Sequence, residues 1–170
     1  SARMSEAFRY ETAGFGGGCH WCTEGVFDAV RGVARVEQGF IAGPSPDEAF
    51  SEAVRVSFDP SAAALEELIA IHLATHSSHS NHALRERYRS AVYVLDSEQA
   101  ARAEAVLQAA RRTLARPPVT RVIRLEAFQP SPERFWNYAR RNAGKPFCRT
   151  YIDPKLKVLR EEFPRLAADR

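Results

Sequence analysis

The sequence has little of what membrane proteins and disulfide-stabilised secreted proteins need. The uncharged stretch from Ala13 to Thr23 is rich in glycine and too short to cross a lipid bilayer. The first residues, Ser1–Glu6, carry no apolar core behind a basic start, so no secretory signal is expected. Cysteine occurs three times, an odd count that fits no secreted disulfide framework. These absences predict a cytoplasmic protein.

Lysine is nearly absent, and no concentrated basic face is visible along the chain. The chain has 24 basic and 21 acidic residues, and only Lys145, Lys155 and Lys157 are lysines. A net charge of +3 spread over scattered arginines describes a solvated surface, whereas nucleic-acid binding usually needs clustered positive charge. We therefore expect a monomer without nucleic-acid or membrane partners.

What is present is the composition of one globular domain. Hydrophobic residues make up 45% of the 170 residues and charged residues 26%. That length is enough to bury a sizeable core, and no linker or internal repeat divides it. Residues 1–170 are expected to form a single domain, with 1–6 and 163–170 as flexible ends.

The hydrophobic pattern predicts alternating strands and helices. In the third strand, Val54, Val56 and Phe58 share one face. The expected strands cover residues 7–15, 33–41, 51–58, 90–95 and 120–128. The expected helices cover residues 19–30, 65–73, 97–114, 131–144 and 155–162. This order favours an α+β fold, a two-layer α/β sandwich with a mixed central sheet and a ferredoxin-like core.

The segment from Gly16 to Cys22 contains three glycines and two cysteines. The glycines allow a tight turn and the close approach of another molecule. Cys19 then falls in the first helical turn, where free N–H groups and the helix dipole stabilise a thiolate, the nucleophilic form of cysteine. A small buried cysteine would not need the second thiol three positions later. We therefore interpret Cys19 as reactive.

The neighbours of Cys19 each allow more than one role. Trp21 is either a core residue or a wall of an apolar pocket. His20 is a surface histidine, a proton-transfer group or a substrate contact. Glu24 is either a first-turn acid that favours the helix dipole or a buried hydrogen-bond partner. Its negative charge would oppose a nearby thiolate, so no catalytic role is assigned to it.

Several collinear motifs resemble the type A peptide methionine sulfoxide reductases. Gly-Cys-His-Trp-Cys-Thr-Glu at 18–24 is similar to that family's Gly-Cys-Phe-Trp-x-x-Glu signature. The further matches, in the family order, are residues 38–43, 51–56, 88–93 and 147–148. On these motifs the chain is identified as a divergent member of the family.

The resemblance implies thiol-dependent reduction of a methyl sulfoxide, with the S-sulfoxide of methionine as the expected substrate. Cys19 would attack the sulfur and become a sulfenic acid. Glu52 would give a proton to the sulfoxide oxygen and Tyr88 would donate a hydrogen bond to it. From the residues alone, Glu52 is equally an outward-facing strand residue, and Tyr88 a core or edge tyrosine.

The resemblance also implies recycling through a second thiol, without a bound cofactor and with an external dithiol such as thioredoxin as reductant. Cys22 and Cys148 are both candidates for the resolving thiol. A disulfide needs closely spaced Cα atoms, and a regular helix can aim the sulfurs of Cys19 and Cys22 poorly. The segment 144–148 looks mobile and matches the family's recycling position, so Cys148 is the first choice.

The departures from the family pattern bear on the substrate. His20 stands where the family has a pocket phenylalanine, and Phe40 replaces its first pocket tyrosine. With Trp21 as the wall for the methyl group, these residues form the expected substrate pocket. The loop before Tyr88 is short and lacks the family's aspartate, for which His79 and His82 are candidate replacements. The chemistry is expected to persist with altered recognition of a peptide main chain.

Histidines and cysteines together leave two other functions open. The five histidines are His20, His72, His76, His79 and His82. With the two neighbouring cysteines they could form a zinc-binding module. The polar residues 77–81 end the helix, so the histidines need not converge and no metal is expected. The other alternative is a dithiol–disulfide oxidoreductase that uses the Cys-x-x-Cys pair directly.

Overall fold

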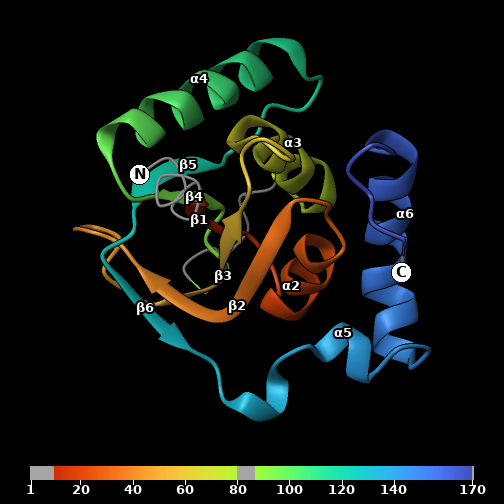
Figure 1. Ribbon diagram of the computed structural model, residues 1–170. Coiled ribbons are helices and arrows are strands. Elements are labelled where there is room, and N and C mark those ends of the chain that lie inside the picture. Colours follow the sequence, from red (N-terminus) through yellow and green to blue (C-terminus); the bar gives the residue numbers. More distant parts are fainter. Residues whose placement is uncertain (1–9, 80–86, 170) are drawn as a thin grey trace, which may run out of the picture.

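A curled six-stranded sheet with helices packed against it forms the molecule (Figure 1). The computed structural model describes residues 10–79 and 87–169. The strands are β1 Glu11–Gly16, β2 Val33–Ala42, β3 Ser51–Phe58, β4 Ala91–Val94, β5 Arg121–Arg124 and β6 Ala127–Pro130. The helices are α2 His20–Asp28, α3 Leu65–Thr75, α4 Ser97–Thr113, α5 Tyr138–Arg141 and α6 Asp153–Glu162. A 3₁₀ turn covers Glu133–Phe135 and a π-helical turn covers Cys148–Ile152.

The sheet is rolled until its two edges approach one another. Its strand order is β5-β4-β1-β3-β2-β6, and only the β4–β5 pair is parallel. The Leu125 N–H donates to the Val94 carbonyl of β4 (2.9 Å), whereas the next N–H, of Glu126, donates to the Ala42 carbonyl of β2 (3.0 Å). The single strand expected at 120–128 is therefore two strands, because the chain crosses between opposite edges at this point.

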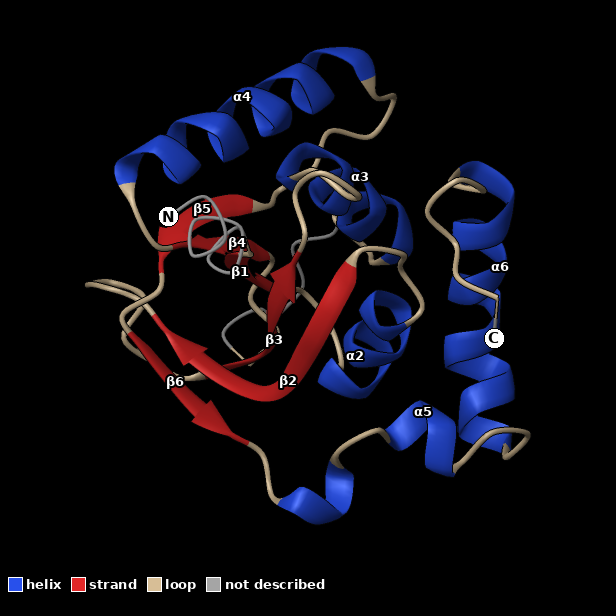
Figure 2. Ribbon diagram, viewed as in Figure 1, coloured by secondary structure: helices blue, strands red, loops and turns tan. Residues whose placement is uncertain are grey.

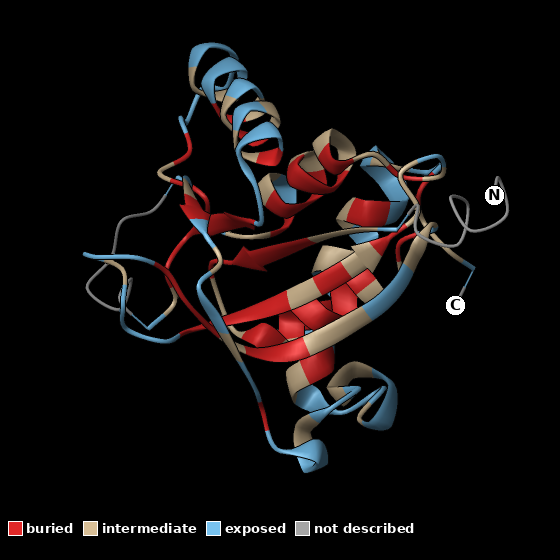
Figure 3. Ribbon diagram, turned by 60° about the vertical axis from the view of Figure 1, so that its left-hand side comes forward, coloured by how far each residue is buried: buried red, intermediate tan, exposed pale blue. Residues whose placement is uncertain are grey.

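Both faces of the sheet carry buried apolar side chains. Helices α2, α3 and α4 cover one face (Figures 2 and 3). On that face the side chains of Val54, Val56 and Phe58 are fully buried. The inner face of the curl encloses a second apolar cluster, formed by Ile41, Ala53, Ala91, Tyr93 and Ile123. The α+β class and the mixed sheet are confirmed. The curl adds this second core on the side of the sheet opposite those helices.

The helix boundaries follow local chemistry where the sequence signals are strong. Asp96 caps α4 by accepting a hydrogen bond from the Gln99 N–H at 2.8 Å. The helix expected at 131–144 is wrong as a single element. Asn137 takes a left-handed conformation (φ 57°) between the 3₁₀ turn and α5, and this interrupts the helical hydrogen-bond ladder.

The C-terminal segment packs against the end of α2 and its following loop. Leu166 is buried and its carbonyl accepts a hydrogen bond from the Arg31 N–H (2.7 Å). The Ala168 N–H donates to the Ala29 carbonyl (2.8 Å), so residues 163–169 are held where a flexible end was expected. The other expected flexible end, 1–6, lies outside the described residues. Within those residues, no helix combines the length and hydropathy needed to cross a membrane.

Candidate active site

Cys19 is presented by a glycine turn that joins β1 to α2. Gly17 has φ +146°, and a Cβ at this position would lie 2.5 Å from the His76 ring, so both conformation and space require glycine. Cys19 is half-buried and is the N-cap residue of α2, with φ −59° and ψ 126°. It therefore stands just outside the regular helix, and its side chain is not bound to helical geometry.

The environment makes Cys19 the more acidic member of the Cys19–Cys22 pair. A hydrogen bond from the Cys22 thiol lowers the pKa of Cys19, and the N–H groups of Trp21 and Cys22 add to this effect, while burial and Glu52 oppose it. The same hydrogen bond and burial raise the pKa of Cys22. A thiolate consequently forms first on Cys19, the residue that the sequence predicts as the nucleophile.

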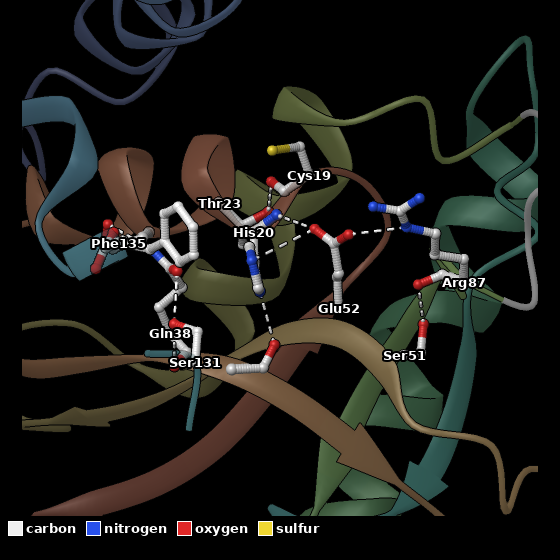
Figure 4. A network of polar contacts seen from close by, with 11 residues as sticks. Cys19, His20, Thr23, Gln38, Ser51, Glu52, Arg87, Ser131 and Phe135 are labelled. Carbon is white, nitrogen blue, oxygen red and sulfur yellow. Dashed lines mark hydrogen bonds and ion pairs between the residues drawn. The ribbon is translucent and has the colours of Figure 1, made fainter. Parts of the chain in front are cut away.

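Glu52 is buried on β3 and lies beside the start of α2 (Figure 4). One carboxylate oxygen accepts the His20 backbone N–H at 3.2 Å, and the other accepts the Arg87 Nε at 3.1 Å. The Arg87 carbonyl in turn accepts hydrogen bonds from Ser51 Oγ (2.8 Å) and the Glu52 N–H (2.9 Å). Glu52 therefore faces into the molecule, and the interpretation as an outward-facing strand residue is wrong.

His20 is buried between Glu52 and β2. Its Nδ1 lies 2.7 Å from the Gly39 carbonyl oxygen, which can only accept, so Nδ1 carries a proton. Its Nε2 lies 3.5 Å from Glu52 Oε1. The imidazole therefore joins the Gly39 carbonyl to the Glu52 carboxylate. The surface-histidine interpretation of His20 is wrong.

A pocket of about 520 Å³ brings most of the expected substrate residues together. Burial, and then the charge of Glu52, raise the pKa of Tyr88, so its hydroxyl stays protonated and able to donate. The expected residues that line the pocket are Cys19, His20, Trp21, Phe40, Glu52 and Tyr88. His79 does not line it: this exposed side chain lies 3.3 Å from Arg116. His82 lies outside the described residues.

One wall of the pocket is an aromatic stack. Trp21 lies parallel to Tyr138 with ring centroids 4.1 Å apart, and Phe135 and Phe147 lie 5.6 Å from it. Glu24 supports this stack, because its carboxylate accepts the N–H groups of Asn137 (2.9 Å) and Tyr138 (3.0 Å). Of its two predicted roles, Glu24 is the buried hydrogen-bond partner.

All three thiols belong to one cluster. Cys22, Cys148 and Ile152 are buried together, and Cys19 packs against them. Cys148 is 2% exposed and begins the π-helical turn, whereas the segment that ends at this residue was expected to be free of regular structure. Burial raises its pKa. None of the three is in a disulfide.

A second pocket, of about 350 Å³, reaches Cys19 from the side of the thiol cluster. Cys19 and Cys22 line it together with Lys155 of α6, Phe147 and Tyr151. Cys19 is thus shared by two pockets, one lined by Glu52 and the other by a second thiol.

Sequence reasoning missed Arg87, Lys155 and Tyr138. Arg87 directly precedes the expected Tyr88, and this adjacency was its only signal. Lys155 and Tyr138 reach the site by packing against α2 from positions more than a hundred residues later, and no local pattern marks them.

The histidines do not gather around a metal in the part of the chain that the structure describes. His72 Nε2 lies 2.7 Å from the Gly16 carbonyl oxygen, and His76 Nε2 lies 2.8 Å from Ser90 Oγ. Within residues 10–79 and 87–169, no group of three or more histidine, cysteine or acidic side chains could hold a metal ion.

Comparison with known proteins agrees with this geometry. A model of the family described as peptide methionine sulfoxide reductase matches residues 11–166. A protein of Sulfolobus acidocaldarius named peptide methionine sulfoxide reductase MsrA is 31% identical over 94% of this chain and 99% of its own length. A protein of Deinococcus radiodurans with the same name is 34% identical over 90% of this chain and 82% of its own length.

Solved structures show the same fold. The reduced form of Mxr1 from Saccharomyces cerevisiae superimposes with a TM-score of 0.73 at 18% identity, covering 84% of this chain and 91% of Mxr1. Mxr1 in complex with Trx2 gives a TM-score of 0.61 at 16% identity, covering 74% of this chain and 83% of that one.

Proposed function

This chain belongs to the peptide methionine sulfoxide reductase family, and we propose that it divides the family's reaction between the two pockets that share Cys19. It is a thiol-dependent oxidoreductase of the peptide-methionine (S)-S-oxide reductase type. The observation that carries the proposal is the acidified Cys19 thiol between a pocket lined by Glu52 and Tyr88 and a pocket lined by Cys22.

In the first pocket the Cys19 thiolate attacks the sulfoxide sulfur. The sulfoxide oxygen accepts a proton from Glu52 and a hydrogen bond from the Tyr88 hydroxyl, which makes the sulfur electrophilic. The oxygen passes to Cys19 as a sulfenic acid, and methionine leaves. His20 Nε2 lies 3.5 Å from Glu52 Oε1, so the imidazole is positioned to return a proton to the carboxylate after this step.

The methyl group of the substrate packs against Trp21, which the stack with Tyr138 holds in place. Phe40 lines the same pocket, and its ring lies 5.1 Å from the His20 ring. Phe40 has no hydroxyl for the substrate main chain, so we expect recognition to depend on the sulfoxide and methyl group more than on backbone groups.

Recycling takes place in the second pocket. The Cys22 thiol has the largest effect in lowering the pKa of Cys19 and is the nearest thiol to it along the chain, which supports Cys22 as the thiol that first attacks the sulfenic acid. Because Cys19 is an N-cap residue with a non-helical ψ, it is free of the regular helical geometry that disfavoured this pair. Cys148 packs against Cys22 and is suited to a later exchange.

A thioredoxin-type dithiol is the proposed external reductant. The second pocket gives an external thiol access to a Cys19–Cys22 disulfide, and the fold similarity extends to Mxr1 bound to Trx2. No resident metal or cofactor is needed for either half of the reaction. Three unpaired thiols fit a reducing compartment such as the cytoplasm.

The inner strands β4-β1-β3-β2, with α2 and α3, are proposed to form a ferredoxin-like core. Their order and antiparallel pairing support this assignment. We further propose that residues 1–170 act as one domain, since one curled sheet organises the described helices, and that this domain acts as a monomer.

The deciding experiment measures consumption of both diastereomers of methionine sulfoxide with a dithiol reductant. Free, N-blocked and protein-bound forms are compared. We expect turnover of the S-sulfoxide only, with little gain from a free main-chain amine. Equal turnover of both diastereomers, or none of either, would contradict the proposed function.

A further inference from the structure

Lys155 places a partly buried amine in the pocket that contains Cys19 and Cys22. It lies on α6, and its Nζ donates a hydrogen bond to the Thr75 carbonyl at the end of α3. Burial lowers the pKa of Lys155, while the charges of Cys22 and Cys19 act in the opposite direction. Because a buried ammonium loses its hydration, it is usually retained only beside an anion.

The pocket that contains Lys155 is lined by thiols and not by a carboxylate. None of the described residues that line the pocket is an aspartate or a glutamate. Lys157, two positions later on α6, instead lies 3.9 Å from Glu161 and is 67% exposed. The anion that Lys155 can meet is therefore a thiolate of the Cys19–Cys22 pair.

Cys22 needs help before it can act as a nucleophile. Its hydrogen bond to Cys19 and its burial both raise its pKa, and Lys155 is the cation that opposes them. A protonated thiol attacks sulfur poorly, so a resolving Cys22 must lose its proton at the moment of attack.

We infer that Lys155 takes the proton from Cys22 as that thiol attacks the sulfenic acid of Cys19, and then gives the proton to the departing hydroxide. The inference rests on the proposed function, in which a sulfenic acid forms on Cys19. It adds a proton carrier to the resolving step, distinct from Glu52, which serves the sulfoxide.

The step balances without another reactant. The neutral amine accepts the Cys22 proton, and the Cys22 sulfur forms a bond to the Cys19 sulfur while the S–O bond of the sulfenic acid breaks. The hydroxide takes the proton from the Lys155 ammonium and leaves as water. The Cys22 sulfur is oxidised by as much as the Cys19 sulfur is reduced.

The test follows single turnovers of Lys155→Met by rapid quench and mass spectrometry. Methionine keeps the apolar stem but has no proton to carry. We expect one equivalent of methionine to form at the wild-type rate, whereas loss of the sulfenic acid to disulfide slows by about 10²-fold, a common effect of removing a positioned acid or base. A wild-type rate of disulfide formation in Lys155→Met would overturn the inference.

Two matched variants separate proton transfer from charge and from damage to α6. Lys157→Met removes a lysine from the same helix and should behave as wild type. Lys155→Arg keeps the charge but stays protonated, so it should remain slower than wild type. Disulfide formation at the wild-type rate in Lys155→Arg would exclude proton transfer. If wild-type protein forms no methionine in the first step, the proposed function fails instead.

The pH profile of disulfide formation gives a readout that a structural role would not move. The titratable side chains that face the pocket with Lys155 are Cys19, Cys22, His72, His76 and Tyr151. In wild type the rate should rise with pH as Lys155 becomes neutral, and Lys155→Met should lose this inflection and keep those of the other groups. An unchanged profile would also overturn the inference.

Discussion

The two pockets that meet at Cys19 differ in the chemistry of their walls. The pocket of Glu52 holds a carboxylate, an arginine and a tyrosine hydroxyl, groups that give protons or hydrogen bonds to oxygen. The pocket of Lys155 holds two thiols, an amine, two imidazoles and a tyrosine hydroxyl, without a carboxylate among its described residues. Removing oxygen from sulfur needs donors, whereas joining two sulfurs needs a thiolate and no competing anion.

This difference means that each pocket should control one half-reaction. A substitution on the Glu52 side should slow formation of the sulfenic acid and leave its resolution intact. A substitution on the thiol side should do the reverse. Cys19 lines both pockets, so its removal should stop both half-reactions.

The largest expected effect is that of Cys19→Ser. A serine hydroxyl does not ionise near neutral pH and is a poor nucleophile toward sulfur. Sulfoxide reduction should fall to the uncatalysed background, while the fold persists because the replacement is isosteric. Product methionine is measured by chromatography and the fold by thermal unfolding. Turnover by a folded Cys19→Ser protein would show that another residue attacks the substrate.

Glu52→Gln should affect the first half-reaction alone. Glutamine keeps an oxygen for the His20 N–H but has no acidic proton, and loss of a positioned acid commonly costs about 10²–10⁴-fold in rate. Rapid-quench measurement of methionine formation gives the rate. Glu37→Gln is the matched control, since Glu37 lies on the neighbouring strand in an ion pair with Arg55 (3.0 Å) outside the pocket. A first step as fast as that of Glu37→Gln would remove Glu52 from the proton path.

On the thiol side, the Cys22→Ser and Cys148→Ser variants should differ in the form of Cys19 that accumulates. After one equivalent of sulfoxide, Cys22→Ser should retain Cys19 as a sulfenic acid, and Cys148→Ser should form the Cys19–Cys22 disulfide. Both variants should release one equivalent of methionine, because resolution follows loss of the oxygen. Mass mapping of the three thiols distinguishes these states. A Cys19–Cys148 disulfide appearing first in wild type would restore the order expected from the sequence.

The sequence predicted the first pocket better than the second. Cys19, Glu52 and Tyr88 stand in collinear motifs, and the alternation of β3 is a local signal that predicted its bounds. The burial of Cys148 and the place of Lys155 depend on how the last forty residues pack onto α2, which no local periodicity records. Local periodicity also does not predict the division into β5 and β6, because this division depends on the curl of the whole sheet.

The smallest effect should come from Glu24→Gln, which acts on the pocket wall and on no reacting atom. Glu24 uses its two oxygens to accept three donors: the Asn137 and Tyr138 N–H groups and Gln38 Nε2 (3.1 Å). Glutamine offers one oxygen, so a buried N–H loses its partner, at a cost of about 1–3 kcal/mol in unfolding free energy. Tyr138 then supports Trp21 less firmly, and KM should rise with little change in kcat.

The pH dependence of this variant's stability identifies the carboxylate as the cause. Burial raises the pKa of Glu24 in the folded state, so the folded protein holds a proton on Glu24 more tightly than the unfolded chain does. Wild-type stability therefore decreases as pH rises through that pKa. Glutamine lacks this titration, and the stability lost on substitution should therefore be larger in acid than near neutral pH. Chemical denaturation of both proteins across this range measures the difference. A constant difference would mean that Glu24 keeps the same affinity for protons in the folded and unfolded chains, and the wall would then owe its position to packing of Trp21 on Tyr138 alone.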